Sequence, residues 1–325
     1  MHLTDGFDRT FQYLRLSLTD ACNFRCSYCL PDGFKKCGTP PPLSRDELRR
    51  AARAFVSLGL RKIRLTGGEP TIRPDFDDIL ADMRSVHGLK KLALTTNGYK
   101  LPDRIERWRA LGLDAINVSL DSLNRETFRR ITGHDRCHEV LHGIHRALEA
   151  GFATVKINVV YMKGINDHEV ADFIALTRTL PVSIRFIELM ETGDHAAFFR
   201  NHHISTDVIT DQLKGSGWTP VIKAVDGGPA VEFMHTDHAG RIGLIAPYSK
   251  DFCKSCNRLR FSSQGNLHLC LFGNFGIPMR DYLQSDDQLE ELQQKLIAAV
   301  RRKDISHQLA FGNAGMTRNL SAIGG

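Results

Sequence analysis

The sequence predicts an α/β protein with a parallel sheet over its first two thirds and a small antiparallel addition after it. Three observations support this fold class. Strand-like runs alternate with longer helical patterns, which is typical of a parallel sheet. From about Ile204 onward the chain becomes Gly-rich, and its strand-like runs are short and alternating. A chain of 325 residues is long enough for one large domain with a smaller appendage.

Six runs rich in β-branched and apolar residues are expected to be strands, joined by helical crossovers. The runs cover residues 13–18, 62–66, 90–96, 114–120, 155–161 and 182–189. Residues 44–60 are expected to form an amphipathic helix, because Ser44 and Glu47 make a capping box at its start. The series of six β-α units therefore predicts parallel pairing throughout this region.

The last third of the chain has a different pattern. Residues 230–236 and 241–247 are expected to be strands of an antiparallel addition. We place the boundary near residue 220, so that residues 1–220 form one domain and residues 221–325 form a C-terminal region. Two further helical patterns follow Pro278.

Composition and charge exclude several classes of protein. No run of about 18 or more apolar residues occurs, so no membrane span is expected. The first residues lack the basic and apolar stretches of a signal peptide, which predicts a cytoplasmic protein. The net charge of +6 agrees with an anionic ligand, but it is not gathered into the basic blocks typical of nucleic-acid binding.

Polar side chains occupy one face of several predicted strands at a period of two, and apolar side chains occupy the other face. The inside of a filled barrel is mostly apolar, and buried arginine is costly without an anion beside it. We therefore predict a cavity for an anionic ligand, rather than an arginine paired with a carboxylate on each strand. The polar residues are Arg15, Ser17, Thr19, Arg64, Thr66, Asn117, Ser119, Lys156 and Asn158.

Six of the eight cysteines fall into two tight groups, and in a reducing compartment such groups indicate metal binding or catalysis. The first triplet is Cys22, Cys26 and Cys29, directly after the first predicted strand, where α/β barrels place their active sites. Thiolates bind zinc or iron-sulfur clusters, and no fourth Cys or His follows closely to complete a zinc site. Three cysteines on a cluster of four irons would leave one iron open for a small molecule.

The second triplet is Cys253, Cys256 and Cys270, in a C-x2-C-x13-C pattern. One interpretation is a structural zinc site with His268 as the fourth ligand. That interpretation would make the chain a zinc-ribbon protein that binds nucleic acid, which is an alternative outside the enzymes.

The C-x3-C-x2-C spacing, with Tyr28 directly before its last cysteine, closely resembles the signature of the radical S-adenosylmethionine superfamily. The TGGEP turn at residues 66–70 agrees, because its glycines allow backbone groups to approach a ligand closely. Further stretches occur in the same order in the GTP 3',8-cyclases of molybdenum cofactor biosynthesis, and the resemblance runs from Tyr13 to Gly325. These stretches are CNFRCSYC, TGGEP, LTTNG, NVSLD, KINVV, KGIND, RFIELM, CKSCNRLR and the terminal IGG.

The resemblance implies a partial (β/α)6 barrel of the TIM type, whose mouth is closed by a C-terminal α+β extension. It also implies two 4Fe-4S clusters, one on each cysteine triplet. In this family the first cluster binds S-adenosylmethionine and generates a 5'-deoxyadenosyl radical, and the second cluster holds the guanine base. The implied reaction of this lyase converts GTP to (8S)-3',8-cyclo-7,8-dihydroguanosine 5'-triphosphate. A peptide-modifying radical S-adenosylmethionine enzyme with auxiliary clusters is the alternative within the superfamily.

Site residues follow from the same resemblance, position by position. The expected catalytic residues are the first triplet, Arg258 and Arg260. The expected GTP contacts are Arg15, Arg64, Thr95, Lys156, Arg258, Leu259 and Arg260. The expected S-adenosylmethionine contacts are Tyr28, Gly68, Ser119 and Met190. Arg185 also points inward by strand parity and is a weaker candidate.

The resemblance also implies partners and a role for the chain end. The expected partners are a reductant such as flavodoxin or ferredoxin, a downstream cyclic pyranopterin monophosphate synthase, and a second copy in a homodimer. Gly324 and Gly325 are expected to insert toward the cavity and to order the reacting groups. Leu320 replaces a Met found in many members, and Cys37 and Cys137, outside both triplets, are expected to be free buried thiols without an assigned role.

Overall fold

The computed structural model describes most of the chain. It covers residues 2–323, apart from residues 36, 37, 39, 223–227, 251, 255, 274, 275, 308, 310–314 and 316–322. The expectations for Cys37, Leu320, Gly324 and Gly325 fall outside the described residues.

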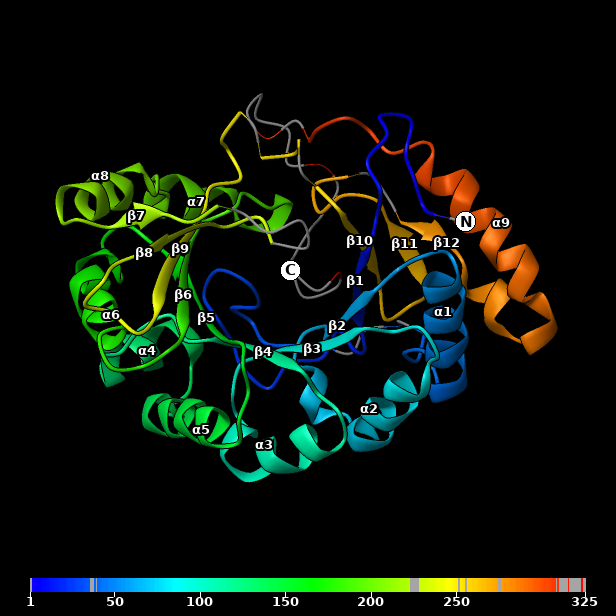
Figure 1. Ribbon diagram of the computed structural model, residues 1–325, viewed down its shortest axis with the longest axis horizontal. Helices are drawn as coiled ribbons and strands as arrows, with labels where there is room; N and C mark the ends of the chain where they lie inside the picture. Colours follow the sequence, from blue (N-terminus) through cyan, green and yellow to red (C-terminus); the bar gives the residue numbers. More distant parts are fainter. Residues whose placement is uncertain are drawn as a thin grey trace.

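A mostly parallel sheet runs through the described part of the chain (Figure 1). Its twelve strands have the order β12-β11-β10-β1-β2-β3-β4-β5-β6-β9-β8-β7. The central six strands follow the sequence order and pair in parallel, which confirms all six predicted strands. They are β1 (Tyr13–Ser17), β2 (Lys62–Thr66), β3 (Lys91–Thr96), β4 (Ala115–Ser119), β5 (Val155–Tyr161) and β6 (Ser183–Glu188).

Helices cover the outer side of this curved sheet (Figure 1). The predicted capping box of α1 is confirmed, because the Ser44 hydroxyl accepts from the Glu47 N–H while the Glu47 carboxylate accepts from the Ser44 N–H. The helices are α1 (Arg45–Ser57), α2 (Phe76–Ser85), α3 (Leu101–Ala110), α4 (Arg125–Thr132), α5 (Cys137–Glu149), α6 (Val170–Leu176), α7 (Ala196–His202), α8 (Asp207–Gly215) and α9 (Leu289–Val300). Short 3-10 helices cover Pro70–Ile72, Asp167–Glu169, Gly193–His195, Arg280–Leu283 and Asp286–Gln288.

The strands of the last third extend both edges of the central sheet. The predicted antiparallel pair is present as β8 (Val231–Met234) and β9 (Arg241–Ile245). It is not a separate addition, however, because β9 also pairs in parallel with β6. At the other edge β10 (Arg258–Phe261) pairs in parallel with β1. The pairing is favourable because it satisfies the backbone groups of two exposed sheet edges.

Short strands complete the two ends of the sheet. Beyond β8 lies β7 (Thr219–Pro220), and beyond β10 lie β11 (Asn266–His268) and β12 (Ile277–Pro278), all paired antiparallel. Because β7 and β12 have one neighbour each, the sheet is not closed in the described part of the chain.

The apolar core lies between the sheet and its helices. On β1, Leu14 and Leu16 are completely buried in this core, whereas Arg15 between them faces the other way and lines a cavity. The period of two therefore separates a hydrophobic outer face from a polar inner face, as predicted. Among the described residues, no helix has the length and apolar character needed to cross a membrane.

Candidate active site

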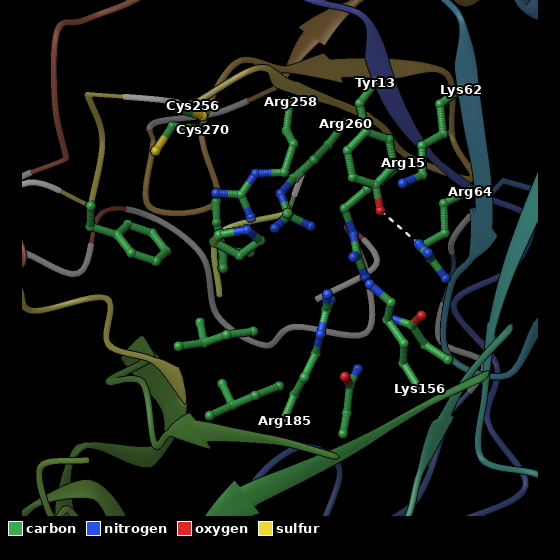
Figure 2. A pocket seen from close by; sticks show the side chains of 18 of the residues that line it. Tyr13, Arg15, Lys62, Arg64, Lys156, Arg185, Cys256, Arg258, Arg260 and Cys270 are labelled. Carbon is green, nitrogen blue, oxygen red and sulfur yellow. Dashed lines mark hydrogen bonds between the residues drawn. The ribbon is translucent and has the colours of Figure 1, made fainter. Parts of the chain in front are cut away.

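The inner face of the sheet surrounds a strongly cationic cavity (Figure 2). Eight lysine and arginine side chains line it, and no Asp or Glu does so among the described residues. They come from six strands, and the labelled side chains in Figure 2 point toward a common space. The prediction of a polar inner face that forms a cationic cavity is confirmed. The eight residues are Arg15, Lys62, Arg64, Lys91, Lys156, Arg185, Arg258 and Arg260.

Tyr13 lies among the cations on one wall of this cavity. The Nε atom of Arg64 donates a hydrogen bond of 2.6 Å to the Tyr13 hydroxyl, drawn in Figure 2. Burial alone would raise the pKa of Tyr13, but the charges of Arg64, Arg15 and Lys62 outweigh it and lower the pKa to about 7. Sequence reasoning missed Tyr13, although its shared strand face with Arg15 could have indicated it.

Glu232 lies outside the cavity lining and forms ion pairs with two of the cations that do line it. Its Oε1 atom lies 2.8 Å from Nη2 of Arg185 and 3.6 Å from Nζ of Lys156. Arg185 and Glu232 are both in register with Gly243 of β9, where a Cβ atom would lie 3.1 Å from the Arg185 side chain. The missing side chain at Gly243 leaves room for the ion pair. Sequence reasoning missed Glu232, because only the register between distant strands brings it here.

Crowding of cations lowers several pKa values in the cavity. Burial lowers the pKa of Arg15, Tyr13 opposes this, and with the charges of Arg64 and Arg258 the pKa falls to about 10. Burial and the neighbouring Arg185 lower the pKa of Lys156 to about 8. An anionic ligand would relieve this mutual repulsion, so the cavity is suited to a compact polyanion such as a phosphate chain.

The second cysteine triplet opens onto the same cavity. Cys253, Cys256 and Cys270 all line it, and all are free thiols. Burial alone would raise the pKa of Cys253, but contacts of His307 and Ser306 lower it to about 6. Burial also opposes ionisation of Cys256, yet the charges of Arg258 and Lys303 lower its pKa. This end of the cavity therefore stabilises thiolates, which are the form that binds iron.

The first triplet sits in a turn after β1 and does not line the cavity. The Cys29 N–H donates to the Cys26 carbonyl at 2.9 Å, and the Ser27 N–H donates to the Ile131 carbonyl at 2.9 Å, which anchors the turn to the end of α4. Burial raises the pKa of Cys22 to about 11, and burial followed by the charge of Asp121 raises that of Cys26 well above its usual value.

The donor sets of both triplets fit iron-sulfur clusters. No described group of three or more His, Cys, Asp or Glu side chains converges so as to hold a single metal ion. In a cubane cluster, however, each thiolate binds a different iron, so the three sulfur atoms need not converge on one point. Three cysteine side chains on each triplet supply the required ligands, and in each case one iron would stay open.

Two of the expected S-adenosylmethionine contacts lie beside the first triplet. The Tyr28 hydroxyl donates to Asp121 at 2.8 Å. A Cβ atom at Gly68 would lie 2.3 Å from the Ala21 carbonyl oxygen, so only glycine fits against the loop that leads into the triplet. Met190 lines the cavity, and Ser119 ends β4 outside its lining. The ligand roles of these four residues stay predictions.

Two expected GTP contacts do not line the cavity. The hydroxyl of Thr95 accepts a hydrogen bond of 3.4 Å from Nη1 of Arg64, which does line the cavity. The side chain of Leu259 is completely buried in the hydrophobic core, so only its backbone could reach a ligand.

Cys137 is buried and free, as expected, and its thiol lies 3.5 Å from the Ser122 carbonyl oxygen.

Comparisons with known proteins agree with this arrangement. The profile of the Radical SAM superfamily matches residues 16–177, and that of Molybdenum Cofactor Synthesis C matches residues 182–309. The GTP 3',8-cyclase of Stenotrophomonas maltophilia (strain R551-3) is 52% identical over 323 residues, which cover 99% of each chain. The GTP 3',8-cyclase of Yersinia pestis is 52% identical over 325 residues, which cover 100% of each chain.

A solved structure shows the same fold at low sequence identity. Streptococcus suis SuiB bound to S-adenosylmethionine has a TM-score of 0.63 and 13% identity, over 90% of this chain and 68% of that chain. This likeness concerns the fold alone. The sequence identity of 52% over the full length is much stronger evidence, and it shows that the chain belongs to the GTP 3',8-cyclase family of the radical SAM superfamily.

Proposed function

We propose that this protein converts GTP to (8S)-3',8-cyclo-7,8-dihydroguanosine 5'-triphosphate, an early step of molybdenum cofactor biosynthesis, with S-adenosylmethionine and two 4Fe-4S clusters. One observation supports the proposal independently of family membership. A cavity lined by eight lysines and arginines opens onto three free cysteine thiols. A nucleoside triphosphate matches both features, because its phosphates need cations and its base needs a separate anchor.

The side chains bind and orient, and the cofactors supply the chemistry that side chains cannot. When bound, the clusters and S-adenosylmethionine provide one-electron chemistry. The first triplet would hold one cluster, with Tyr28, Gly68, Ser119 and Met190 around the S-adenosylmethionine. The second triplet would hold the other cluster beside the guanine base.

The cationic residues would place GTP relative to these groups. Arg15, Arg64, Lys156, Arg258 and Arg260 would bind the phosphates and the base by charge-assisted hydrogen bonds. Arg258 and Arg260 alternate along β10, so both reach the cavity while Leu259 between them packs in the core. Thr95 would act through its contact with Arg64, and Leu259 through its backbone.

The chain end would also enter this cavity. Ile323, the residue before the terminal glycines, is buried, and its carbonyl accepts a hydrogen bond of 3.3 Å from Nη1 of Arg260. We infer that Gly324 and Gly325 continue toward the bound groups. Deletion of both residues should leave iron content intact and sharply lower cyclisation, measured as product per 5'-deoxyadenosine. Unchanged product formation would show that the tail has no role.

The finer architecture and the partners belong to the same proposal. A partial (β/α)6 barrel over residues 1–220, closed at its mouth by an α+β region over residues 221–325, agrees with the parallel order of β1 to β6 and with the antiparallel strands after residue 219. The proposal includes a cytoplasmic homodimer, a flavodoxin or ferredoxin as reductant, and a cyclic pyranopterin monophosphate synthase as the next enzyme.

The proposed function can be tested with anaerobically purified protein. We would quantify iron and sulfide, and then incubate the protein with GTP, S-adenosylmethionine and dithionite while following the product by mass spectrometry. The expected result is a product that contains all the carbon, nitrogen, oxygen and phosphorus atoms of GTP, together with 5'-deoxyadenosine. Cleavage of S-adenosylmethionine without any GTP-derived product would favour a peptide-modifying enzyme, and colourless zinc-containing protein would favour the zinc-ribbon alternative.

A further inference from the structure

The N-terminal hook, residues 3–11, precedes the barrel strands and contains a fixed arginine. The hook closes on itself through a bridge between Thr4 and Thr10. Arg9 donates from Nε to Oδ2 of Asp5 at 2.7 Å, and the Asp5 side chain is completely buried. The backbone N–H groups of Phe7 and Arg9 donate to the other Asp5 oxygen. The Arg9 guanidinium is therefore held in one orientation.

Arg9 joins this hook to two distant segments of the chain. Its Nη1 atom donates to the Cys253 carbonyl at 3.2 Å and to the Ile305 carbonyl at 2.6 Å. Its Nη2 atom donates to the Asp304 carbonyl at 2.6 Å. One guanidinium thus fastens residues 304–305 against the backbone of a cysteine in the second triplet. Only the planar fork of arginine can make such a set of contacts at once.

The segment that Arg9 holds carries His307 to the same cysteine. The His307 ring lies between Phe252 and Phe272, with ring centroids 5.8 Å and 5.2 Å away. Its Nδ1 atom accepts a hydrogen bond from the Leu309 N–H, which leaves the proton on Nε2. That Nε2 atom is buried and has no hydrogen-bond partner among the described residues, yet His307 and Cys253 line the same cavity and interact. A buried donor without a partner needs an acceptor.

We propose that Arg9 is a positioning residue for the second cluster, and that it raises the reduction potential of that cluster by holding His307 as a hydrogen-bond donor beside Cys253. The inference rests on the proposed function, because it assumes a cluster on the second triplet. The acceptor for Nε2 would be the Cys253 thiolate or a sulfide of the cluster.

The direction of the effect follows from charge. Reduction adds one electron to the cluster, so a hydrogen-bond donor at its sulfur atoms and a nearby cation stabilise the reduced form more than the oxidised form. Loss of Arg9 would release residues 304–307 and withdraw the donor, so the potential should fall. A lysine at this position would keep the charge but could not span the three carbonyls.

The experiment isolates the second cluster. A background variant with Cys22, Cys26 and Cys29 all changed to Ala can assemble a cluster only on the second triplet. In this background we would compare Arg9, Arg9→Lys and Arg9→Gln, with Arg302→Gln as a matched control that removes an exposed charge from the same segment. Iron and sulfide contents report assembly, and a redox titration followed by electron paramagnetic resonance reports the midpoint potential.

We expect about a tenfold fall in the equilibrium constant for reduction in Arg9→Gln, which for a one-electron couple is about 59 mV. The midpoint potential should fall by a smaller amount in Arg9→Lys, and in Arg302→Gln it should equal that of the background variant. His307→Phe, which keeps the ring between Phe252 and Phe272, should lower the potential as well. If Arg9 acts through His307, Arg9→Gln should have a much smaller effect when added to His307→Phe than alone.

Each outcome bears on the inference. An unchanged potential in Arg9→Gln, or equal effects of Arg9→Gln with and without His307→Phe, would overturn it. If Arg9→Gln loses iron at an unchanged melting temperature while Arg9→Lys retains it, the result would support the role of Arg9 in positioning the second cluster, with the effect seen at cluster assembly. If the background variant with Arg9 intact binds no iron, the proposed second cluster is itself wrong and the inference fails with it.

Discussion

The surroundings of the two cysteine triplets have opposite effects on the ionisation of their thiols. The first triplet is compact, three cysteines within eight residues, and its surroundings oppose ionisation, so that the pKa of Cys22 rises to about 11. The second triplet is drawn from residues 253–270, and its surroundings favour ionisation, so that the pKa of Cys253 falls to about 6. The spacing of the cysteines gave no indication of this electrostatic difference.

The difference arises from the groups that the fold packs against each triplet. Buried carboxylates lie by the first, since Asp121 raises the pKa of Cys26 after burial does. Cations lie by the second, because Arg258 and Lys303 lower the pKa of Cys256. A cluster with thiolate ligands is anionic, so its environment sets how readily it accepts an electron. Two sites with the same ligands are thereby given different electrostatic environments.

The largest expected effect comes from a substitution that removes one cysteine of the first triplet. Cys26→Ala should abolish 5'-deoxyadenosine formation, because two thiolates do not hold a radical-generating cluster. Cys137→Ala, which removes a free buried thiol outside both triplets, is the matched control and should retain activity. Product quantitation by liquid chromatography checks both variants, and wild-type amounts of 5'-deoxyadenosine from Cys26→Ala would contradict the role of the first triplet.

The second prediction tests the charge difference directly in metal-free protein. At pH 7 a thiol with a pKa of about 6 is mostly thiolate, whereas one with a pKa of about 11 is almost entirely protonated. The lower nucleophilicity of the more acidic thiol offsets part of this advantage. Iodoacetamide should still modify Cys253 on the order of a hundredfold faster than Cys22. Mass spectrometry of timed digests measures the ratio, and equal rates would remove the distinction between the two triplets.

The third prediction concerns the cations of the cavity onto which the second triplet opens. Arg258→Ala and Arg64→Ala should each weaken GTP binding by about 1.5–3 kcal/mol, or roughly ten- to a hundredfold, because a charge-assisted contact is lost. Both variants should keep their iron. Arg129→Ala removes an exposed arginine outside the cavity and serves as the control. Calorimetry that finds unchanged GTP affinity in both cavity variants would exclude them from the binding site.

The smallest expected effect concerns a titratable side chain that lines the cavity among these cations. Tyr13 has a pKa of about 7, so it becomes a phenolate as the pH rises through neutrality and then repels a triphosphate. GTP affinity of the wild type should therefore fall by roughly three- to tenfold between pH 6 and pH 8, and the fall should be absent in Tyr13→Phe. Parallel pH dependences in the two proteins, measured by calorimetry, would show that Tyr13 does not titrate in this range.

Periodicity and spacing were sufficient for much of the fold and of the site. All six central strands, the α1 capping box and the polar inner face were predicted, because each depends on residues that are close in the sequence. The two triplets were also identified from their spacing, and their role as cluster ligands stays a prediction. The placement of β9 beside β6, and of β10 beside β1, was not predicted, because any exposed parallel edge offers the same backbone groups to a strand.

The sequence by itself determined which chemical groups this protein carries: two sets of three thiols, a row of inward cations and a family membership. The tertiary structure alone decided which charges meet. Glu232 reaches Arg185 across Gly243, and Arg9 reaches Cys253 from 244 residues away. Strand periodicity says which face a side chain occupies, but electrostatic energy depends on distances between elements. Those distances follow from register and packing, which no local pattern encodes.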